Sequence, residues 1–131
     1  MKRAFFALSV VAACLTACSK SGPDPNEVMG QAAKIYYDYL IQGKYDAYVD
    51  GFYQPDSIPE SYREQLITNA KMFTGLMKEQ HKGLKSVSIA SAKADTTRHI
   101  GHAFLIMCFG DSTREEVVVP MVEHNGNWML K

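Results

Sequence analysis

The sequence predicts an α+β domain: about three N-terminal helices packed on a curved, cone-like, four-stranded antiparallel meander. Apolar residues recur with the helical period of about 3.6 as far as Gly83, and with a period nearer to 2 beyond it. The pair Asn125-Gly126 then separates two apolar stretches, and it is a strong signal of a two-residue hairpin turn because both positions accept positive φ. Helices that precede such a meander pack on one face of its sheet.

The first helix is expected to begin at Pro25. Asp24 can cap it, Pro25 suits its first position, and Glu27 has the spacing of a capping box. Gly43 is expected to end it. One face of this helix carries the apolar side chains, namely Val28, Met29, Ala32, Ala33, Ile35, Tyr36, Tyr39 and Leu40.

Two more helices are expected before Gly83. Residues 44–53 predict a short helix, which the segment from Pro55 to Pro59 interrupts. A longer helix follows from about Pro59 to His81. Its apolar stripe consists of Tyr62, Leu66, Ala70, Phe73, Leu76 and Met77.

Four strands are expected after Gly83, over residues 84–95, 99–109, 115–124 and 127–131. The second and third of them are long and rich in β-branched and aromatic residues, while the first alternates weakly. The only tryptophan, Trp128, follows the Asn-Gly turn and is expected to close the core against the first or third helix.

Two details of strand register follow from the turn residues. A two-residue turn at Asp111-Ser112 would place His99 opposite His124. Pro120 cannot donate to a ladder, so either a bulge or an outward-facing amide position is expected there.

The N-terminus predicts export and lipid attachment. Residues 1–17 have the basic start and short apolar run of a cleaved signal peptide, too short for the roughly 20 apolar residues of a membrane span. Leu15-Thr16-Ala17-Cys18 resembles the lipobox of bacterial lipoproteins, in which the Cys is acylated and becomes the mature N-terminus. Cys18 is therefore the predicted lipid site, residues 18–24 a flexible tether and residues 25–131 a single domain.

Charge and localisation follow from this cleavage. Loss of Lys2 and Arg3 leaves 12 of the 14 basic residues against 14 acidic ones, a formal charge of −2. That balance argues against nucleic acid as a partner and against electrostatic binding to anionic lipids. Membrane association is expected through acyl chains alone. Ser19, rather than Asp, follows Cys18, which favours the outer membrane over the inner membrane.

Two segments resemble the nuclear-transport-factor-2-like (NTF2-like) superfamily: the tyrosine-rich first helix running into residues 43–48, and residues 117–128 with their Gly turn and Trp. Over residues 25–131 the chain is similar to short bacterial lipoproteins of lumazine-binding-like or unknown function. The resemblance implies a cone in which a curved sheet wraps a long helix, sometimes around a pocket. The superfamily includes isomerases, dehydratases and non-enzymatic binding domains, so the fold alone does not select a function.

Tyrosines are the candidate pocket residues. All seven lie between Tyr36 and Tyr62, and Tyr36, Tyr39 and Tyr48 are expected to face the space between helix and sheet. There they would supply aromatic walls and hydroxyl groups for a planar ligand. The alternative is ordinary core packing. Tyr37 is expected to point away from the apolar stripe.

Asp50 and His102 are the candidate catalytic residues, since a buried carboxylate or imidazole beside tyrosine hydroxyls can move a proton. Solvation is the expected fate of Asp50 and its neighbour Asp46. No metal site is expected, because His99 and His124 lack a third ligand. No cofactor motif is present. Cys108 lies in an apolar run and is expected to be a buried, unreactive thiol.

Together these observations predict a lipid-anchored, non-catalytic envelope domain that binds a small apolar or aromatic ligand or a partner protein. An isomerase- or dehydratase-like enzyme is the alternative, and an interaction module that uses the open sheet face is a third.

If Cys18 is the lipid site, mass spectrometry of the membrane fraction will show an acylated N-terminal Cys18. Cys18→Ser removes the only sulfur at the predicted cleavage site, so the variant will leave that fraction. An unmodified wild-type chain that begins elsewhere contradicts the prediction.

Overall fold

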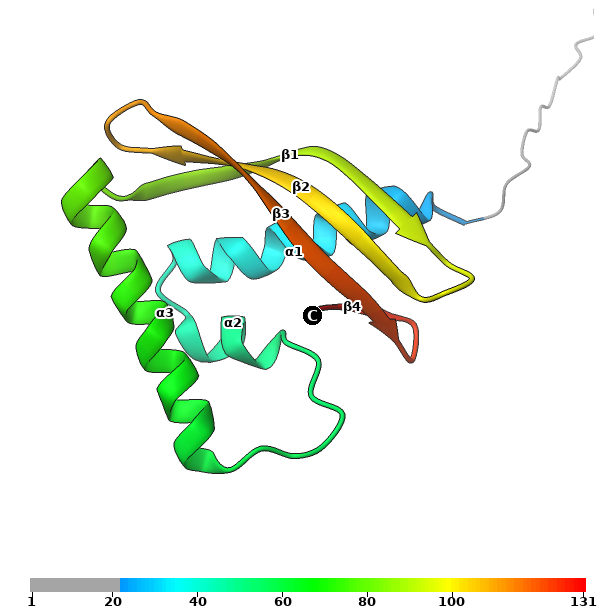
Figure 1. Ribbon diagram of the computed structural model, residues 1–131. Helices are drawn as coiled ribbons and strands as arrows, with labels where there is room; N and C mark the ends of the chain where they lie inside the picture. The colour runs from blue at the N-terminus through cyan, green and yellow to red at the C-terminus, as the bar shows by residue number, and fades with distance from the viewer. Residues whose placement is uncertain (1–21) are drawn as a thin grey trace, which may run out of the picture.

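The computed structural model describes residues 22–131, in which three helices precede four strands (Figure 1). The helices are α1 (Pro25–Ile41), α2 (Tyr45–Asp50) and α3 (Glu60–His81), and the strands are β1 (Leu84–Asp95), β2 (Ile100–Phe109), β3 (Arg114–His124) and β4 (Asn127–Leu130). The strands form one antiparallel sheet in the order β1-β2-β3-β4. The predicted fold class is confirmed, whereas the predicted signal peptide and Cys18 lie outside the described residues.

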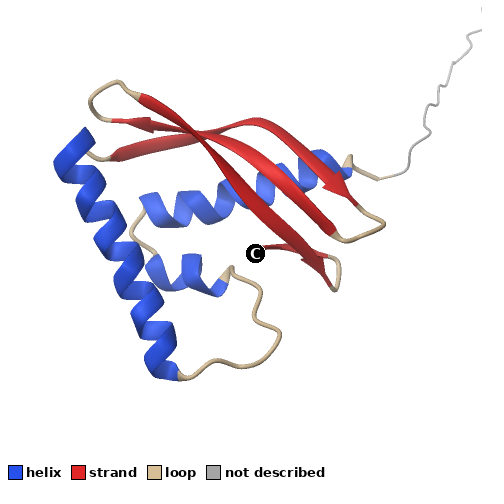
Figure 2. Cartoon of the chain, in the orientation of Figure 1, coloured by secondary structure: helices blue, strands red, loops and turns tan. Residues whose placement is uncertain are grey.

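All three helices lie on the same side of the sheet (Figure 2). Along β2 the odd-numbered side chains from Ala103 to Phe109 are buried against them, while the even-numbered ones are exposed or half-buried. This alternation is expected of a sheet covered on one face only. Within residues 22–131, no helix is long and apolar enough to cross a membrane.

Local sequence sets both ends of α1. Asp24 accepts a hydrogen bond from the Asn26 backbone N–H at 3.0 Å, and Gly43 follows the helix with φ of +79°. The buried stripe is narrower than expected, because Val28 and Ile35 remain 41% and 47% exposed. The buried residues of α1 are Met29, Gly30, Ala33 and Leu40.

Two irregularities bend β1. Its register with β2 shifts between Leu84 and Ser86 and again between Ile89 and Ser91. Such bulges increase the local twist and curve the strand. Two bulges in one twelve-residue strand account for the curvature that the sequence predicted without locating it.

No bulge occurs at Pro120, so that alternative is wrong. Pro120 pairs with His102 in an unbroken β2–β3 register. The Glu123 backbone N–H donates to the His99 carbonyl at 2.8 Å, so these two residues form a hydrogen-bonded pair. Hydrogen-bonded and non-hydrogen-bonded pairs alternate along antiparallel strands. The pair of Pro120 with His102, three residues along, is therefore non-hydrogen-bonded, and the Pro120 nitrogen faces away from β2. It points towards the end of β4, where Lys131 donates to the Pro120 carbonyl at 3.1 Å.

The predicted pairing of His99 with His124 is also wrong. Phe109 and Thr113 close a three-residue turn at Gly110-Asp111-Ser112, in which Ser112 has φ of +73°. The extra turn residue moves the register by one position. His99 consequently lies opposite Glu123, and its Nδ1 is 2.9 Å from Oε1 of that carboxylate.

Trp128 closes the core, as the sequence predicted. It is only 5% exposed and belongs to the main hydrophobic cluster. Its backbone carbonyl accepts a hydrogen bond from the Tyr36 hydroxyl of α1 at 2.9 Å. Leu130, two residues on, pairs with Phe52 in an isolated parallel bridge, so β4 ties α1 and the end of α2 to the sheet.

Trp128→Ala should lower the free energy of unfolding by about 3–5 kcal/mol, because it leaves a large cavity between α1 and the sheet. Denaturant titration measures this loss. As a matched comparison, Tyr36→Phe removes one hydroxyl donor to the Trp128 carbonyl and should cost about 1 kcal/mol. A loss below about 1 kcal/mol for Trp128→Ala would contradict a core role.

Candidate functional site

A partly open cavity of about 600 Å³ lies between α2, the N-terminal half of α3 and the inner face of the sheet. The apolar stripe of α3 lines this cavity because it is packed only loosely against the rest of the domain: of the 22 residues of α3, only Ala70 is buried. The lining consists of Tyr37, Leu40, Tyr48, Val49, Phe52, Gln54, Tyr62, Leu66, Asn69, Ala70, Phe73, Met107, Glu115 and Val117.

The lining of the cavity is mainly apolar. Eleven of the fourteen residues are aliphatic, aromatic or Met, and the three others are Gln54, Asn69 and Glu115. Gln54, Asn69 and Glu115 are all exposed, so the polar groups sit where the cavity meets solvent. An apolar interior with a few polar groups is the usual composition of small-molecule sites.

Three aromatic rings form one wall. Tyr37 and Tyr48 meet edge to face with ring centroids 5.9 Å apart, and Tyr48 meets Phe52 in the same way at 5.4 Å. Burial raises the pKa of Tyr48, and the neighbouring Tyr37 raises it further. Burial also raises the pKa of Tyr37, although a hydrogen bond with Tyr48 partly opposes the shift. Both phenols are therefore neutral at physiological pH and can act as hydrogen-bond donors or acceptors.

The structure separates the three tyrosines named from the sequence. Only Tyr48 lines the cavity. Tyr36 packs against Gly51, where any Cβ would collide with its ring, and donates to Trp128. Tyr39 meets Tyr36 at 6.4 Å between ring centroids and lies under the Lys44 ammonium. Sequence reasoning missed Tyr37, which lies beside the apolar stripe of α1 and faces α2 instead of the sheet.

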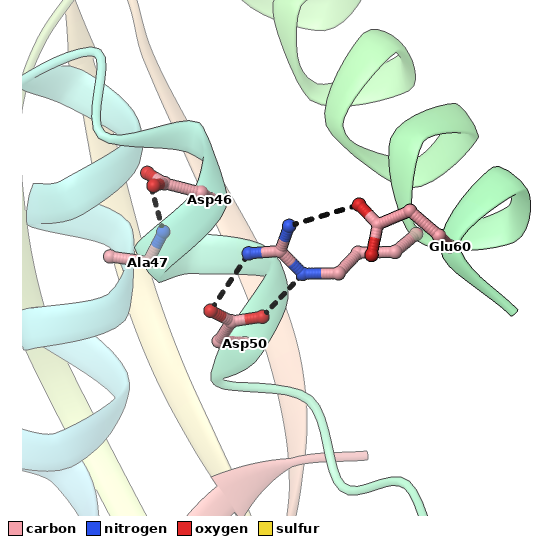
Figure 3. A network of polar contacts seen from close by, with 5 residues as sticks. Asp46, Ala47, Asp50 and Glu60 are labelled. Atoms are coloured by element: carbon pink, nitrogen blue, oxygen red, sulfur yellow. Dashed lines mark hydrogen bonds and ion pairs between the residues drawn. The ribbon is translucent and has the colours of Figure 1, made fainter. Parts of the chain in front are cut away.

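Asp50 is held by an ion pair at the edge of α2. Arg63 of α3 donates to it through Nε and Nη2, both at 3.0 Å, and Glu60 approaches the same guanidinium at 3.8 Å (Figure 3). The Asp50 side chain is 59% exposed, and hydrogen bonding to it raises the pKa of Arg63. Asp46 points elsewhere and accepts from the Ala47 backbone N–H at 2.9 Å (Figure 3). Neither carboxylate lines the cavity.

His102 lies on the opposite face of the sheet from the cavity. It is exposed and pairs with Lys93 and Pro120 on the neighbouring strands. Asp50 and His102 are thus on different sides of the molecule. The expectation that Cys108 is buried is wrong: it is half-buried on the same outer face, opposite Ser86 and Arg114, because even-numbered residues of β2 point away from the helices. Among residues 22–131, no three His, Cys, Asp or Glu side chains are grouped as a metal site would require.

In an alkaline titration of the folded protein, followed by near-ultraviolet absorbance, Tyr37 and Tyr48 should ionise above the ordinary tyrosine pKa of about 10. Their folded pKa values are raised above the ordinary value of about 10, so the stability they contribute is complete below about pH 10 and is lost as pH rises further. The thermal midpoint should therefore fall above that pH, and less so in Tyr48→Phe. Ionisation of Tyr37 and Tyr48 at or below the ordinary pKa of about 10 would contradict this prediction.

Comparison with known proteins supports the fold. No family profile and no curated protein matches the sequence. Among solved structures, the chain is similar to a Campylobacter jejuni protein described as an NTF2-like transpeptidase, with a TM-score of 0.62 and 10% sequence identity. The match covers 76% of this chain and 94% of that one. At this identity the similarity establishes the fold alone: the domain has the NTF2-like fold.

Proposed function

We propose that the chain is a lipid-anchored domain of the bacterial cell envelope that binds a small apolar or aromatic ligand without catalysis. The cavity between α2, α3 and the sheet carries this proposal. Its volume of about 600 Å³ falls within the range of about 300–1,000 Å³ that is typical of small-molecule sites. The anchor rests on the lipobox resemblance at Leu15–Cys18.

The groups around the cavity favour binding over proton transfer. A general base must come within hydrogen-bond reach of its substrate. Asp50 is paired with Arg63 outside the cavity, and His102 is on the other face of the sheet. The remaining carboxylate, Glu115, is exposed at the rim. The neutral phenols of Tyr37 and Tyr48 can orient a ligand but cannot abstract a proton at physiological pH.

Transpeptidase chemistry, which the description of the C. jejuni protein suggests, has no support at this cavity. Acyl transfer of that kind needs an activated nucleophile, usually Ser, Cys or Thr with an adjacent base. None of these three residue types is in the lining. Cys108 is on the outer sheet face and is therefore remote from the cavity.

The uncovered outer face of the sheet supports a second function, docking of a partner protein. Within residues 22–131, no helix covers this face, and it carries a row of apolar side chains at its centre. Val118 is 52% exposed there. The neighbouring apolar residues are Ile100, Phe104, Ile106, Val122 and Met129.

The cavity is tested with the uncharged dye N-phenylnaphthylamine, whose fluorescence rises in an apolar site. The wild-type protein should bind one dye molecule. Ala70→Phe places a ring in the cavity from α3 and should weaken binding at least about tenfold, a loss of about 1.4 kcal/mol. Leu66→Phe repeats the test at a partly exposed position, in case Ala70→Phe is poorly folded.

The matched control is Met72→Phe, on the same helix but 66% exposed and outside the cavity. It should keep the dye affinity within about twofold, which is about 0.4 kcal/mol. Asp50→Asn should do the same, because its partner is Arg63 and not the ligand. Equal losses in Met72→Phe and Ala70→Phe, or no saturable binding by the wild type, would contradict the proposed function.

A further inference from the structure

A second groove, of about 370 Å³, lies on the other side of the α1–α3 crossing and is lined by basic residues. Four lysines surround it: Lys71, Lys78, Lys82 and Lys85. Its remaining lining is apolar or small, with Tyr45 and Thr74 as the other polar side chains. The tyrosine-lined cavity, in contrast, has no basic residue in its lining.

Three separate pieces of the fold bring these lysines together. Lys71 and Lys78 are seven residues apart on α3, two turns along one helix face, so their Cα atoms are about 10 Å apart. Lys82 caps the C-terminus of α3 in the left-handed conformation, with φ of 63°. Lys85 occupies the first register shift of β1 and turns back, so that its Nζ comes within 3.6 Å of the Cβ position of Gly83.

No carboxylate of residues 22–131 lies within ion-pair distance of these four ammonium groups, whereas Lys34 of α1 is held by Asp38 at 2.8 Å. None of the 14 acidic residues in the chain lines the groove. Four uncompensated like charges repel one another, so their gathering costs stability unless an anion is present.

Stabilisation of the α3 dipole does not account for the whole arrangement. Cations near a helix C-terminus interact favourably with its free carbonyls, but this effect fades beyond the last turn. Lys78 and Lys82 are within that range. Lys71 is more than two turns upstream of the helix end, and Lys85 belongs to β1.

We propose that this groove binds an anion that carries two or more phosphate groups. Lysine is a frequent phosphate ligand that acts as a compact point charge. The four lysines of the groove carry more positive charge than the roughly two negative charges of a single phosphate group can balance, so a multiply charged anion fits better. The hydroxyls of Tyr45 and Thr74 are 2.9 Å apart and hydrogen-bond to each other, which leaves recognition mainly to the ammonium groups.

The position of the groove favours a soluble anion over a lipid headgroup. Helix α1 of 17 residues is about 25 Å long, and the chain enters it at Pro25. The groove lies at the far end, where α1, α3 and the start of β1 meet (Figure 1). This choice rests on the anchor of the proposed function: in a chain attached through its N-terminus, the lysines lie at the opposite end of α1 from the attachment point.

Isothermal titration of the purified full chain with inorganic tripolyphosphate at low ionic strength tests the proposal. The wild type should bind it, and binding should weaken steeply with added salt. Lys71→Gln combined with Lys78→Gln should reduce the affinity at least about tenfold. Lys82→Gln combined with Lys85→Gln repeats the test away from the middle of α3.

The matched control combines Lys93→Gln with Lys131→Gln, two exposed lysines outside the groove, and should stay within about twofold of the wild type. Without anion, the Lys71/Lys78 variant should melt at or above the wild-type temperature, since repulsion is relieved. A parallel arm compares flotation with neutral phosphatidylcholine vesicles and with vesicles containing phosphatidylglycerol.

Groove-dependent binding to the anionic vesicles alone would keep the phosphate chemistry and assign it to a lipid headgroup. Absence of binding to both probes, or equal losses in the groove variants and the control, would overturn the proposal. Dye binding in the tyrosine-lined cavity is unaffected by either outcome, so this test is independent of the proposed function.

Discussion

Close packing of α1 against the centre of the sheet is the contact on which the rest of the structure depends. Met29, Leu105 and Met121 are fully buried there. The approach is close because Gly101 has no side chain: a Cβ at this position would collide with the Met29 sulfur. Gly30 likewise leaves only 3.2 Å between its Cβ position and Ala92. With α1 fixed over this part of the sheet, α2 and α3 cover the remainder incompletely, and the cavity lined by Tyr37 and Tyr48 is the space left between them.

The sequence predicted the fold well because its signals were local. Asp24 and Pro25 mark the start of α1, and Asn125-Gly126 marks the last hairpin, each through the conformation of its own backbone. Strand register was harder to predict from the sequence. It depends on whether the turn after Phe109 contains two residues or three, and Ser112 at positive φ adds the third. One residue in that turn decides whether His99 faces His124 or Glu123.

The sites were harder to predict than the fold, for two physical reasons. A helical wheel for α1 recognises one apolar face, but α1 contacts both the sheet and α2, so Tyr37 lies beside the predicted stripe and still lines the cavity. Net charge averages over the whole surface, so a balanced composition conceals a local concentration of lysines. Lys71 and Lys85 line the same groove because the chain reverses direction at Gly83, between α3 and β1.

Helix α3 is fastened mainly towards its two ends. At its C-terminus, the His81 carbonyl accepts a hydrogen bond from the Asp111 backbone N–H. The His81 ring also packs against the Phe109 ring, with centroids 4.8 Å apart. Near its N-terminus, Arg63 is clamped to Asp50 of α2. Between these ends, Ala70 is the one buried residue of α3, and Phe73 packs against the core from a partly buried position. Tyr62 and Leu66 line the cavity from more exposed positions, so substitutions there can change the size and shape of the cavity at less cost in stability than substitutions in the fully buried contact between α1 and the sheet.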